Sequence, residues 1–200
     1  MSKLVYEVTV EDGNTCWRLN GKLHREDGPA IEYVSGTKEW WVNGKLHRED
    51  GPAVEYASGT KEWCVNGKLH RLGGPAIEGV DGAKSWWVNG KRHRLDGPAI
   101  ECDNGTKEWW VNGLLHRSDG PAVEFADGTK EWYVNGKRHR LDGPAVEFAG
   151  GSKYWYINGV NYTEEGFKTK ISEMHPPAAQ SCAGKVVEIE GKRYKLLEII

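Results

Sequence analysis

An asparagine–glycine pair recurs through this 200-residue chain at a fixed interval of 23 residues. The pairs stand at positions 20–21, 43–44, 66–67, 89–90, 112–113, 135–136 and 158–159. Asn-Gly between apolar runs predicts a β-hairpin, because a type I′ turn needs positive φ at both central residues. A tandem repeat with this regularity predicts an array in which each unit packs on its neighbours, rather than one deep globular core.

Other motifs keep the same period. Every unit has a tryptophan in one slot, and six units have His-Arg followed by Gly-Pro-Ala. A second turn, Ser-Gly or Asp-Gly, stands at 35–36, 58–59, 81–82 and 127–128. We therefore expect a mainly β fold, an elongated single-layer antiparallel meander of stacked β-hairpin repeats, with a short C-terminal helix and a terminal hairpin.

A turn at 43–44 fixes which residues face each other. Trp40 then lies opposite His47, and Glu39 lies opposite Arg48. Because opposed residues share a face of a sheet, we expect each tryptophan to pack on a histidine and each such glutamate to pair with an arginine. A β-solenoid is the rival architecture. It would stack like charges about 4.8 Å apart, whereas a two-stranded unit spaces them by roughly 9–10 Å. The weaker repulsion between like charges therefore favours the meander.

The chain divides by composition into five segments. Residues 1–19 are expected to form a capping strand and a half repeat, and residues 20–160 the array. Residues 161–175 have apolar residues at helical spacing after Thr163 and predict a capping helix. Residues 176–184 read as a linker, and residues 185–200 as a hairpin that docks on the array, on a second copy or on a partner.

Charge and cysteine content favour some environments and partners over others. The chain has 27 Lys and Arg against 29 Asp and Glu, a net charge of −2, which argues against a general nucleic-acid binder. No apolar run is long enough to span a bilayer. The four cysteines are scattered without a CxxC pair, so we expect no zinc site, no disulfide framework and a cytoplasmic protein.

The periodic histidines and glutamates do not predict catalysis. Histidines that repeat at roughly 9–10 Å cannot share one zinc ion, and we expect a structural role for them. The glutamates of the Val/Ile-Glu strands also recur six times, so pairing with Lys or Arg is a better interpretation than a glycosidase pair. No nucleophile elbow, HExxH or phosphate-loop motif is present. We expect no catalytic residues, no metal and no cofactor.

What remains is a long surface rich in residue types that are enriched at protein interfaces. The candidate binding face comprises Trp40, Trp41, His47, Arg48, Trp63, His70, Arg71, Trp86, Trp87, His93, Arg94, Trp109, Trp110, His116, Arg117, Trp132, Tyr133, His139 and Arg140. Three slots vary along it: Leu46 becomes Arg92 and Arg138, Trp41 becomes Cys64 and Tyr133, and Glu49 becomes Leu72, Leu95 and Leu141.

Residues 132–151, with Asn-Gly-Lys-Arg-His followed by a strand and a glycine turn, resemble MORN repeats. The resemblance covers about residues 12–160, although Arg replaces the glycine after His and Asp-Gly-Pro-Ala replaces Gly-x-Gly. It implies a twisted single-layer sheet and a scaffold for protein association that is often dimeric and sometimes membrane-linked. Regular arrays of this kind are also similar to proteins of large viruses and phages, which would imply a host cytoplasm.

Our expectation is a non-catalytic repeat scaffold that binds another protein, in the viral case an inhibitor of a host defence protein. A ligand-binding module for nucleotide or glycan is the alternative, since Trp faces stack on sugars and bases and Arg holds phosphate. A peripheral lipid-associated scaffold is the third. A homodimer through the C-terminal hairpin or a sheet end is expected from exposed sheet edges.

Overall fold

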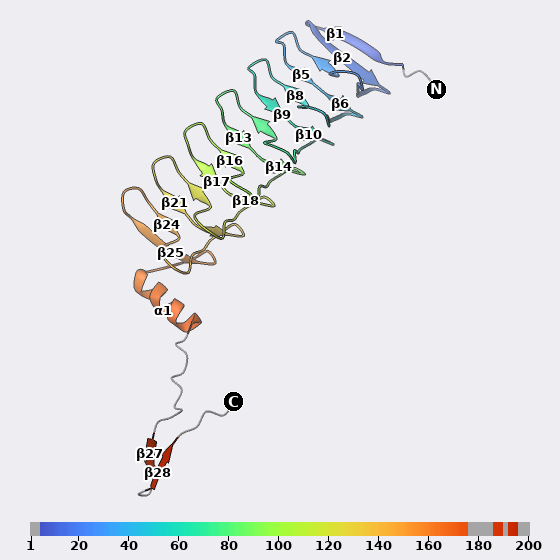
Figure 1. Ribbon diagram of the computed structural model, residues 1–200. Helices are drawn as coiled ribbons and strands as arrows, with labels where there is room; N and C mark the ends of the chain where they lie inside the picture. The colour runs from blue at the N-terminus through green and yellow to red at the C-terminus, as the bar shows by residue number, and fades with distance from the viewer. Residues whose placement is uncertain (1–4, 176–185, 190–191, 196–200) are drawn as a thin grey trace. The chain divides into compact units, whose positions relative to one another are not determined.

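The computed structural model of the protein describes residues 5–175, 186–189 and 192–195. The chain forms two compact units, Met1–Asn161 and Tyr162–Ile200. The first unit contains the whole repeat array, and its hairpins follow one another in sequence order along one ladder (Figure 1).

One antiparallel sheet runs through the first unit and has 16 strands, most of them two residues long. Fifteen of these strands lie side by side in the order β1 (Glu7–Glu11), β2 (Asn14–Leu19), β4 (Ile31–Glu32), β5 (Lys38–Glu39), β8 (Val54–Glu55), β9 (Lys61–Glu62), β12 (Ile77–Glu78), β13 (Lys84–Ser85), β16 (Ile100–Glu101), β17 (Lys107–Glu108), β20 (Val123–Glu124), β21 (Lys130–Glu131), β24 (Val146–Glu147), β25 (Lys153–Ile157) and β26 (Val160–Tyr162). The sixteenth, β3 (Lys22–Leu23), pairs with β2. The mainly β antiparallel meander expected from the sequence is confirmed.

The Asn-Gly hairpins of the five central units form separate two-stranded sheets. They pair β6 (Trp41–Val42) with β7 (Lys45–Leu46), β10 (Cys64–Val65) with β11 (Lys68–Leu69), β14 (Trp87–Val88) with β15 (Lys91–Arg92), β18 (Trp110–Val111) with β19 (Leu114–Leu115), and β22 (Tyr133–Val134) with β23 (Lys137–Arg138). Each repeat therefore contributes four short strands rather than the two that we expected, and the long sheet is built around the second turn instead of the Asn-Gly turn.

The backbone at the Asn-Gly tips explains why this pair recurs. Asn43 has φ of 52° and Gly44 has φ of 76°, and the other six pairs have the same signs. Asparagine and glycine are the residues that adopt this left-handed region at least cost, and two of them in succession make the type I′ turn. Trp41 pairs with Leu46, as a tip at 43–44 requires.

The Asn-Gly hairpins are joined to their neighbours by backbone hydrogen bonds. The Gly44 amide donates to the Leu23 carbonyl of the preceding unit at 2.8 Å, and the Gly67 amide donates to Leu46 in the same way. Threonine side chains of the second turn add a further link, since Thr129 Oγ1 accepts from the Ala149 amide at 3.2 Å. Units thus stabilise one another mainly through contacts between nearest neighbours.

A column of alanines forms the centre of the array. The alanine of every Gly-Pro-Ala motif has no exposed surface, and it exchanges backbone hydrogen bonds with strands on both sides. Val54 and Val146 are also fully buried beside it. A core this narrow explains the low aliphatic content, because alanine with some valine and isoleucine, rather than leucine, fills each layer.

The second unit begins with Tyr162 and contains helix α1 (Glu164–Met174). Thr163 caps it, with its Oγ1 accepting from the Gly166 amide at 3.1 Å, so the helix predicted within 161–175 is confirmed. Strands β27 (Val186–Ile189) and β28 (Lys192–Lys195) pair as an antiparallel hairpin, as predicted within 185–200. The expected linker, 176–184, lies outside the described residues.

Candidate binding surface

A row of tryptophan–arginine pairs runs along the array. The guanidinium carbon of Arg48 lies 4.2 Å from the centroid of the Trp40 ring. The same contact recurs at 3.8–4.2 Å in the pairs Arg25–Trp17, Arg71–Trp63, Arg94–Trp86, Arg117–Trp109 and Arg140–Trp132. These distances are those of cation–π contacts. Arginine, and not the histidine that we expected, lies over each of these indole rings.

Each arginine of this row also holds the Asp-Gly-Pro-Ala loop of its own unit. Arg48 Nε donates to Asp50 at 2.9 Å, and its Nη1 donates to the Pro52 carbonyl at 3.3 Å and to Glu55 at 3.4 Å. A Cβ added at Gly51 would lie 2.7 Å from the Arg48 guanidinium carbon, so a larger residue there would displace the arginine from these contacts. The arginine is therefore a structural element of the repeat.

These contacts confirm one expectation and correct another. The glutamates of the Val/Ile-Glu strands pair with arginine in all six units, at 2.7–3.5 Å. The predicted pair between Glu39 and Arg48 is wrong. Glu39 belongs to the long sheet, where it pairs with Ile31 and Val54, and its Oε2 accepts from Trp41 Nε1 at 2.8 Å.

The arginine also perturbs the aspartate beside it. A hydrogen bond and the charge of Arg48 hold the pKa of Asp50 below its ordinary value of 3.8. The same direction and cause apply to Asp27, Asp96, Asp119 and Asp142, each next to the arginine two residues before it. Arg71 has Gly73 at this place and lacks that partner.

The repeated histidines connect one unit to the next. His24 Nδ1 accepts from the Asn43 amide at 3.2 Å, and five later histidines bond the asparagine 19 residues ahead in the same way. The expected packing of each histidine on a tryptophan is therefore wrong for the ring, whose nitrogen bonds the next turn. The histidine amide does donate to the tryptophan carbonyl of its own unit, as His47 does to Trp40 at 3.0 Å.

A second row of aromatic residues lies on the Asn-Gly hairpins. Trp41 Nε1 donates to Glu39, Trp110 Nε1 donates to Glu108 at 2.7 Å, and Trp87 Nε1 donates to Ser85 at 2.7 Å. The candidate face of the sequence analysis is thus divided into two rows. Trp40 and its equivalents contact arginine, whereas Trp41 and its equivalents contact the preceding strand of the long sheet.

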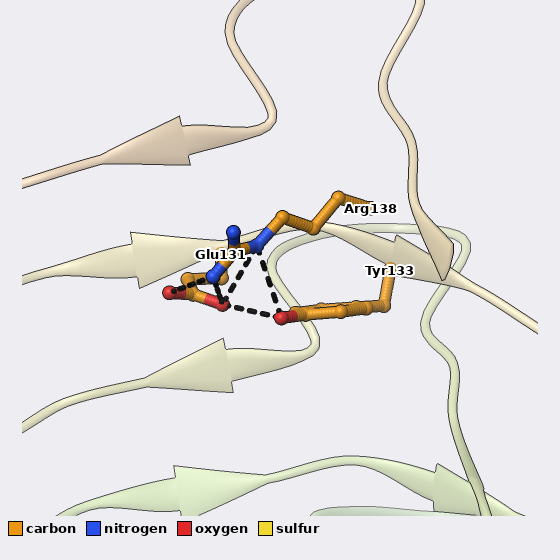
Figure 2. A network of polar contacts seen from close by, with 3 residues as sticks. All are labelled: Glu131, Tyr133 and Arg138. Atoms are coloured by element: carbon orange, nitrogen blue, oxygen red, sulfur yellow. Dashed lines mark hydrogen bonds and ion pairs between the residues drawn. The ribbon is translucent and has the colours of Figure 1, made fainter. Parts of the chain in front are cut away.

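Glu131, Tyr133 and Arg138 form a compact polar cluster in the second row (Figure 2). Tyr133 donates to Glu131 Oε2 at 2.6 Å, and Arg138 Nη2 contacts both oxygens of Glu131 at 3.1 and 3.2 Å. Burial raises the pKa of Tyr133, and the Glu131 carboxylate raises it further. Burial acts to lower the pKa of Arg138, but Glu131 and Tyr133 outweigh it and raise that pKa.

Shallow hollows repeat along the tryptophan–arginine row. One of about 610 Å³ lies between the Arg94–Gly97 loop and Trp109, His116 and Arg117 of the next unit. Others of about 500 and 520 Å³ occupy the equivalent place between Arg71–Pro75 and Trp86, and between Arg25–Gly28 and Trp40. A similar hollow therefore recurs at the same place in several units.

Two exposed leucines distinguish the hollows of the central units. Leu72 is 82% exposed and Leu95 is 80% exposed, and both line the hollow beside Trp86. Glu26 and Glu49 occupy the same slot in the hollow near the N-terminus. Neither leucine is among the individual residues of the predicted face, but their position is one of the three that the sequence shows to vary along it.

No protein-family model matches the chain, and a search of curated proteins finds no significant match. Across residues 5–175, 186–189 and 192–195, no three His, Cys, Asp or Glu side chains gather as metal ligands would. Within the same ranges, none of the helical structure is long and apolar enough to cross a membrane. Cys16, Cys64 and Cys102 are free thiols, and burial raises the pKa of Cys64 to about 11.

Proposed function

We propose that the chain is a non-catalytic repeat scaffold that binds another protein along the row of hollows, with Leu72 and Leu95 as anchors. The exposure of these two leucines carries the proposal. A single exposed leucine is ordinary, but two on adjacent units that share a hollow with Trp86 form an apolar patch with no structural use. Burying one such side chain against a partner contributes about 1.5–3 kcal/mol.

The spacing of the hollows supports a partner that spans several units. Each hollow takes lining residues from two consecutive repeats, and Leu95 borders two of them. One shallow hollow offers a small contact area, so useful affinity requires several to be filled together. A protein segment or flat protein surface meets that requirement better than one small molecule.

The polar contacts of the row favour a protein over a nucleotide. Phosphate recognition needs arginine donors that are free to form charge-assisted hydrogen bonds. Arg48, Arg94, Arg117 and Arg140 already donate to Asp, Glu and a proline carbonyl. The nucleotide or glycan alternative would therefore have to rely on tryptophan faces that arginine already covers.

Protein association is also the role that the MORN resemblance implies. The proposal includes a homodimer that forms through the C-terminal hairpin or through an end of the sheet. A host defence protein is the partner if the viral resemblance holds. Light scattering on the chain with and without residues 176–200 tests the hairpin contact. A mass that stays the same on truncation contradicts it.

The anchors can be tested with substitutions that the array already tolerates. The double variant Leu72→Glu, Leu95→Glu gives the central units a glutamate at this position. Earlier units already have glutamate there, as Glu26 and Glu49. The control is Leu114→Lys, which changes an exposed leucine outside the described hollows to the residue that most other units have at that position. Proteins captured from lysate of the cells in which the chain occurs should be retained by the wild type and by this control, and reduced at least about tenfold with the double variant.

Equal capture by the wild type and the double variant would contradict the proposal. A thermal-shift panel of nucleotides and oligosaccharides tests the alternative in the same preparations, because a bound ligand raises the melting temperature. A shift with one of them, together with no protein lost on the double substitution, would favour the ligand-binding module.

A further inference from the structure

Arg92 lies between two tryptophan rings on the Asn-Gly hairpins. Its guanidinium carbon is 5.2 Å from the centroid of Trp87 and 4.9 Å from that of Trp110. These residues line a hollow of about 340 Å³ together with Lys91 and the next Asn-Gly tip, which we call the Arg92 slot (lining residues Trp87, Gly90, Lys91, Arg92, Trp110, Asn112 and Gly113). The Arg92 slot belongs to the second aromatic row and is separate from the hollows with the exposed leucines.

Among the described residues, the Arg92 side chain has no ion pair and no hydrogen bond, and its Nε is buried. A half-buried guanidinium without an acceptor is costly, because it has lost water contacts without replacing them. The array does not require a cation at this place, since Leu46, Leu69 and Leu115 occupy it in other units.

Arg138 shows what such an arginine binds in this fold. It occupies the equivalent position of the repeat two units later, between Tyr133 at 5.9 Å and Tyr156 at 5.5 Å. Its acceptors are the carboxylate of Glu131 and, for Nε at 3.1 Å, the Tyr133 hydroxyl (Figure 2). Glu131 precedes Arg138 by seven residues, and the residue at that distance before Arg92 is Ser85. The Arg92 slot therefore has the arginine and the flanking rings, but its internal carboxylate is missing.

Neighbouring side chains do not replace that carboxylate. Ser85 Oγ accepts from Trp87 Nε1 at 2.7 Å. Glu108 of the following unit accepts from Trp110 Nε1 at 2.7 Å and forms no ion pair with Arg92 in the part of the chain that the structure describes. Lys91, on the rim of the hollow, adds a second positive charge. The slot is thus electropositive and has aromatic walls.

We propose that the Arg92 slot binds the carboxylate of an acidic side chain from another protein. The planar guanidinium fork matches a carboxylate, as it does inside the array at Arg138. Trp87 and Trp110 would cover the methylene groups of an incoming glutamate. This site does not depend on the leucine anchors, because its recognition group is a charge on the other aromatic row.

The test is a titration of the full chain, labelled with nitrogen-15, with a blocked Gly-Glu-Gly peptide whose termini are acetylated and amidated. The blocked Gly-Gln-Gly peptide is the matched neutral control. We expect saturable shifts of the Arg92 Nε–H and of the Trp87 and Trp110 indole N–H resonances with the glutamate peptide. The glutamine peptide should bind at least about tenfold more weakly, as the loss of charge-assisted hydrogen bonds predicts.

Two variants locate the site. Arg92→Leu adopts the residue of Leu69 and Leu115, and Ser85→Glu restores the internal carboxylate that Glu131 supplies elsewhere. Both should lose binding of the glutamate peptide by about tenfold or more, with a far-ultraviolet spectrum like that of the wild type. Unchanged binding in either variant, or equal shifts with the two peptides, would overturn the proposal. Inorganic phosphate that displaces the glutamate peptide at lower concentration would assign the slot to phosphate instead.

Discussion

Arg48 covers the face of Trp40 at 4.2 Å while its nitrogens hold Asp50, the Pro52 carbonyl and Glu55. One side chain thus joins the indole, the Asp-Gly-Pro-Ala loop and a strand of the long sheet. Because the motif is repeated six times, its arginines contribute to the array as a set. Lysine offers a charge but not the planar fork that makes these contacts together.

Arg48→Lys should therefore destabilise the array by about 1–3 kcal/mol. Arg71→Lys is the matched comparison, because Arg71 lacks the aspartate contact and donates to the Pro75 carbonyl and Glu78. We expect a smaller loss for Arg71→Lys in urea unfolding followed by tryptophan fluorescence. Equal losses in the two variants would mean that the aspartate contact adds no stability.

The sequence predicted the Asn-Gly turns correctly, but it did not predict how residues farther from each turn pair with other strands. Positive φ at Asn43 and Gly44 follows from residue type alone, so the hairpin pair Trp41 and Leu46 was predictable. The register continues to Trp40 and His47, where the His47 amide donates to the Trp40 carbonyl at 3.0 Å, and fails only at Glu39 and Arg48. The Arg48 amide then bonds Cys64 of the next unit, and such contacts between units leave no signal in a single repeat.

The residues of the two proposed binding sites were only partly predicted. Most of the predicted face consists of positions that the units share, and Arg48, His47 and their equivalents at these positions hold the fold together. Exposed Leu72, exposed Leu95 and unpaired Arg92 stand in slots where units differ. Comparing each unit with the others identifies such positions, whereas the consensus removes them.

Threonine links between units give a second prediction. Thr129 is buried, and its Oγ1 accepts from the amide of the exposed Ala149 at 3.2 Å, so Thr129→Val should cost about 0.5–1.5 kcal/mol, the net contribution of one hydrogen bond. Ala83 stands in the same slot and has no hydroxyl, so Ala83→Thr should gain about 0.5–1 kcal/mol. Chemical unfolding of the two variants should show shifts of opposite sign. A loss on Ala83→Thr would mean that the hydroxyl does not reach the Asp103 amide.

A pH dependence follows from the aspartates beside the arginines. Their folded-state pKa values lie below 3.8, so their contribution to stability is present above that pH and is lost as pH falls through the lowered pKa. Gly73→Asp would give Arg71 the partner that the other arginines have, in a place where an added Cβ meets no atom within 4 Å. The melting temperature should rise by no more than about 3 °C at pH 7.

At pH 2 the gain from Gly73→Asp should disappear, because the new carboxyl is then protonated. Gly73→Asn is the control for shape without charge, and it should give no rise at either pH. A gain for Gly73→Asp that persists at pH 2, or an equal gain with asparagine, would show that charge is not the cause.

The Glu131–Arg138 pair allows a double-mutant test of what an unpaired arginine costs in this fold. The Glu131 side chain is 10% exposed, and its removal in Glu131→Ser leaves Arg138 without a carboxylate, as Arg92 is, although the Tyr133 hydroxyl still accepts from Arg138 Nε at 3.1 Å. We expect a loss of about 1–3 kcal/mol for the single variant. Adding Arg138→Leu, the residue of Leu69 and Leu115, should restore part of that stability, because it removes the unpaired charge.

Glu131→Ser should also create a second site for the glutamate peptide, visible as new shifts at Tyr133. Equal stability of the single and double variants would show that an arginine without a carboxylate partner costs this fold no stability. The absence of a second site would show that such an arginine does not bind a glutamate side chain, and either result would count against the proposed role of Arg92.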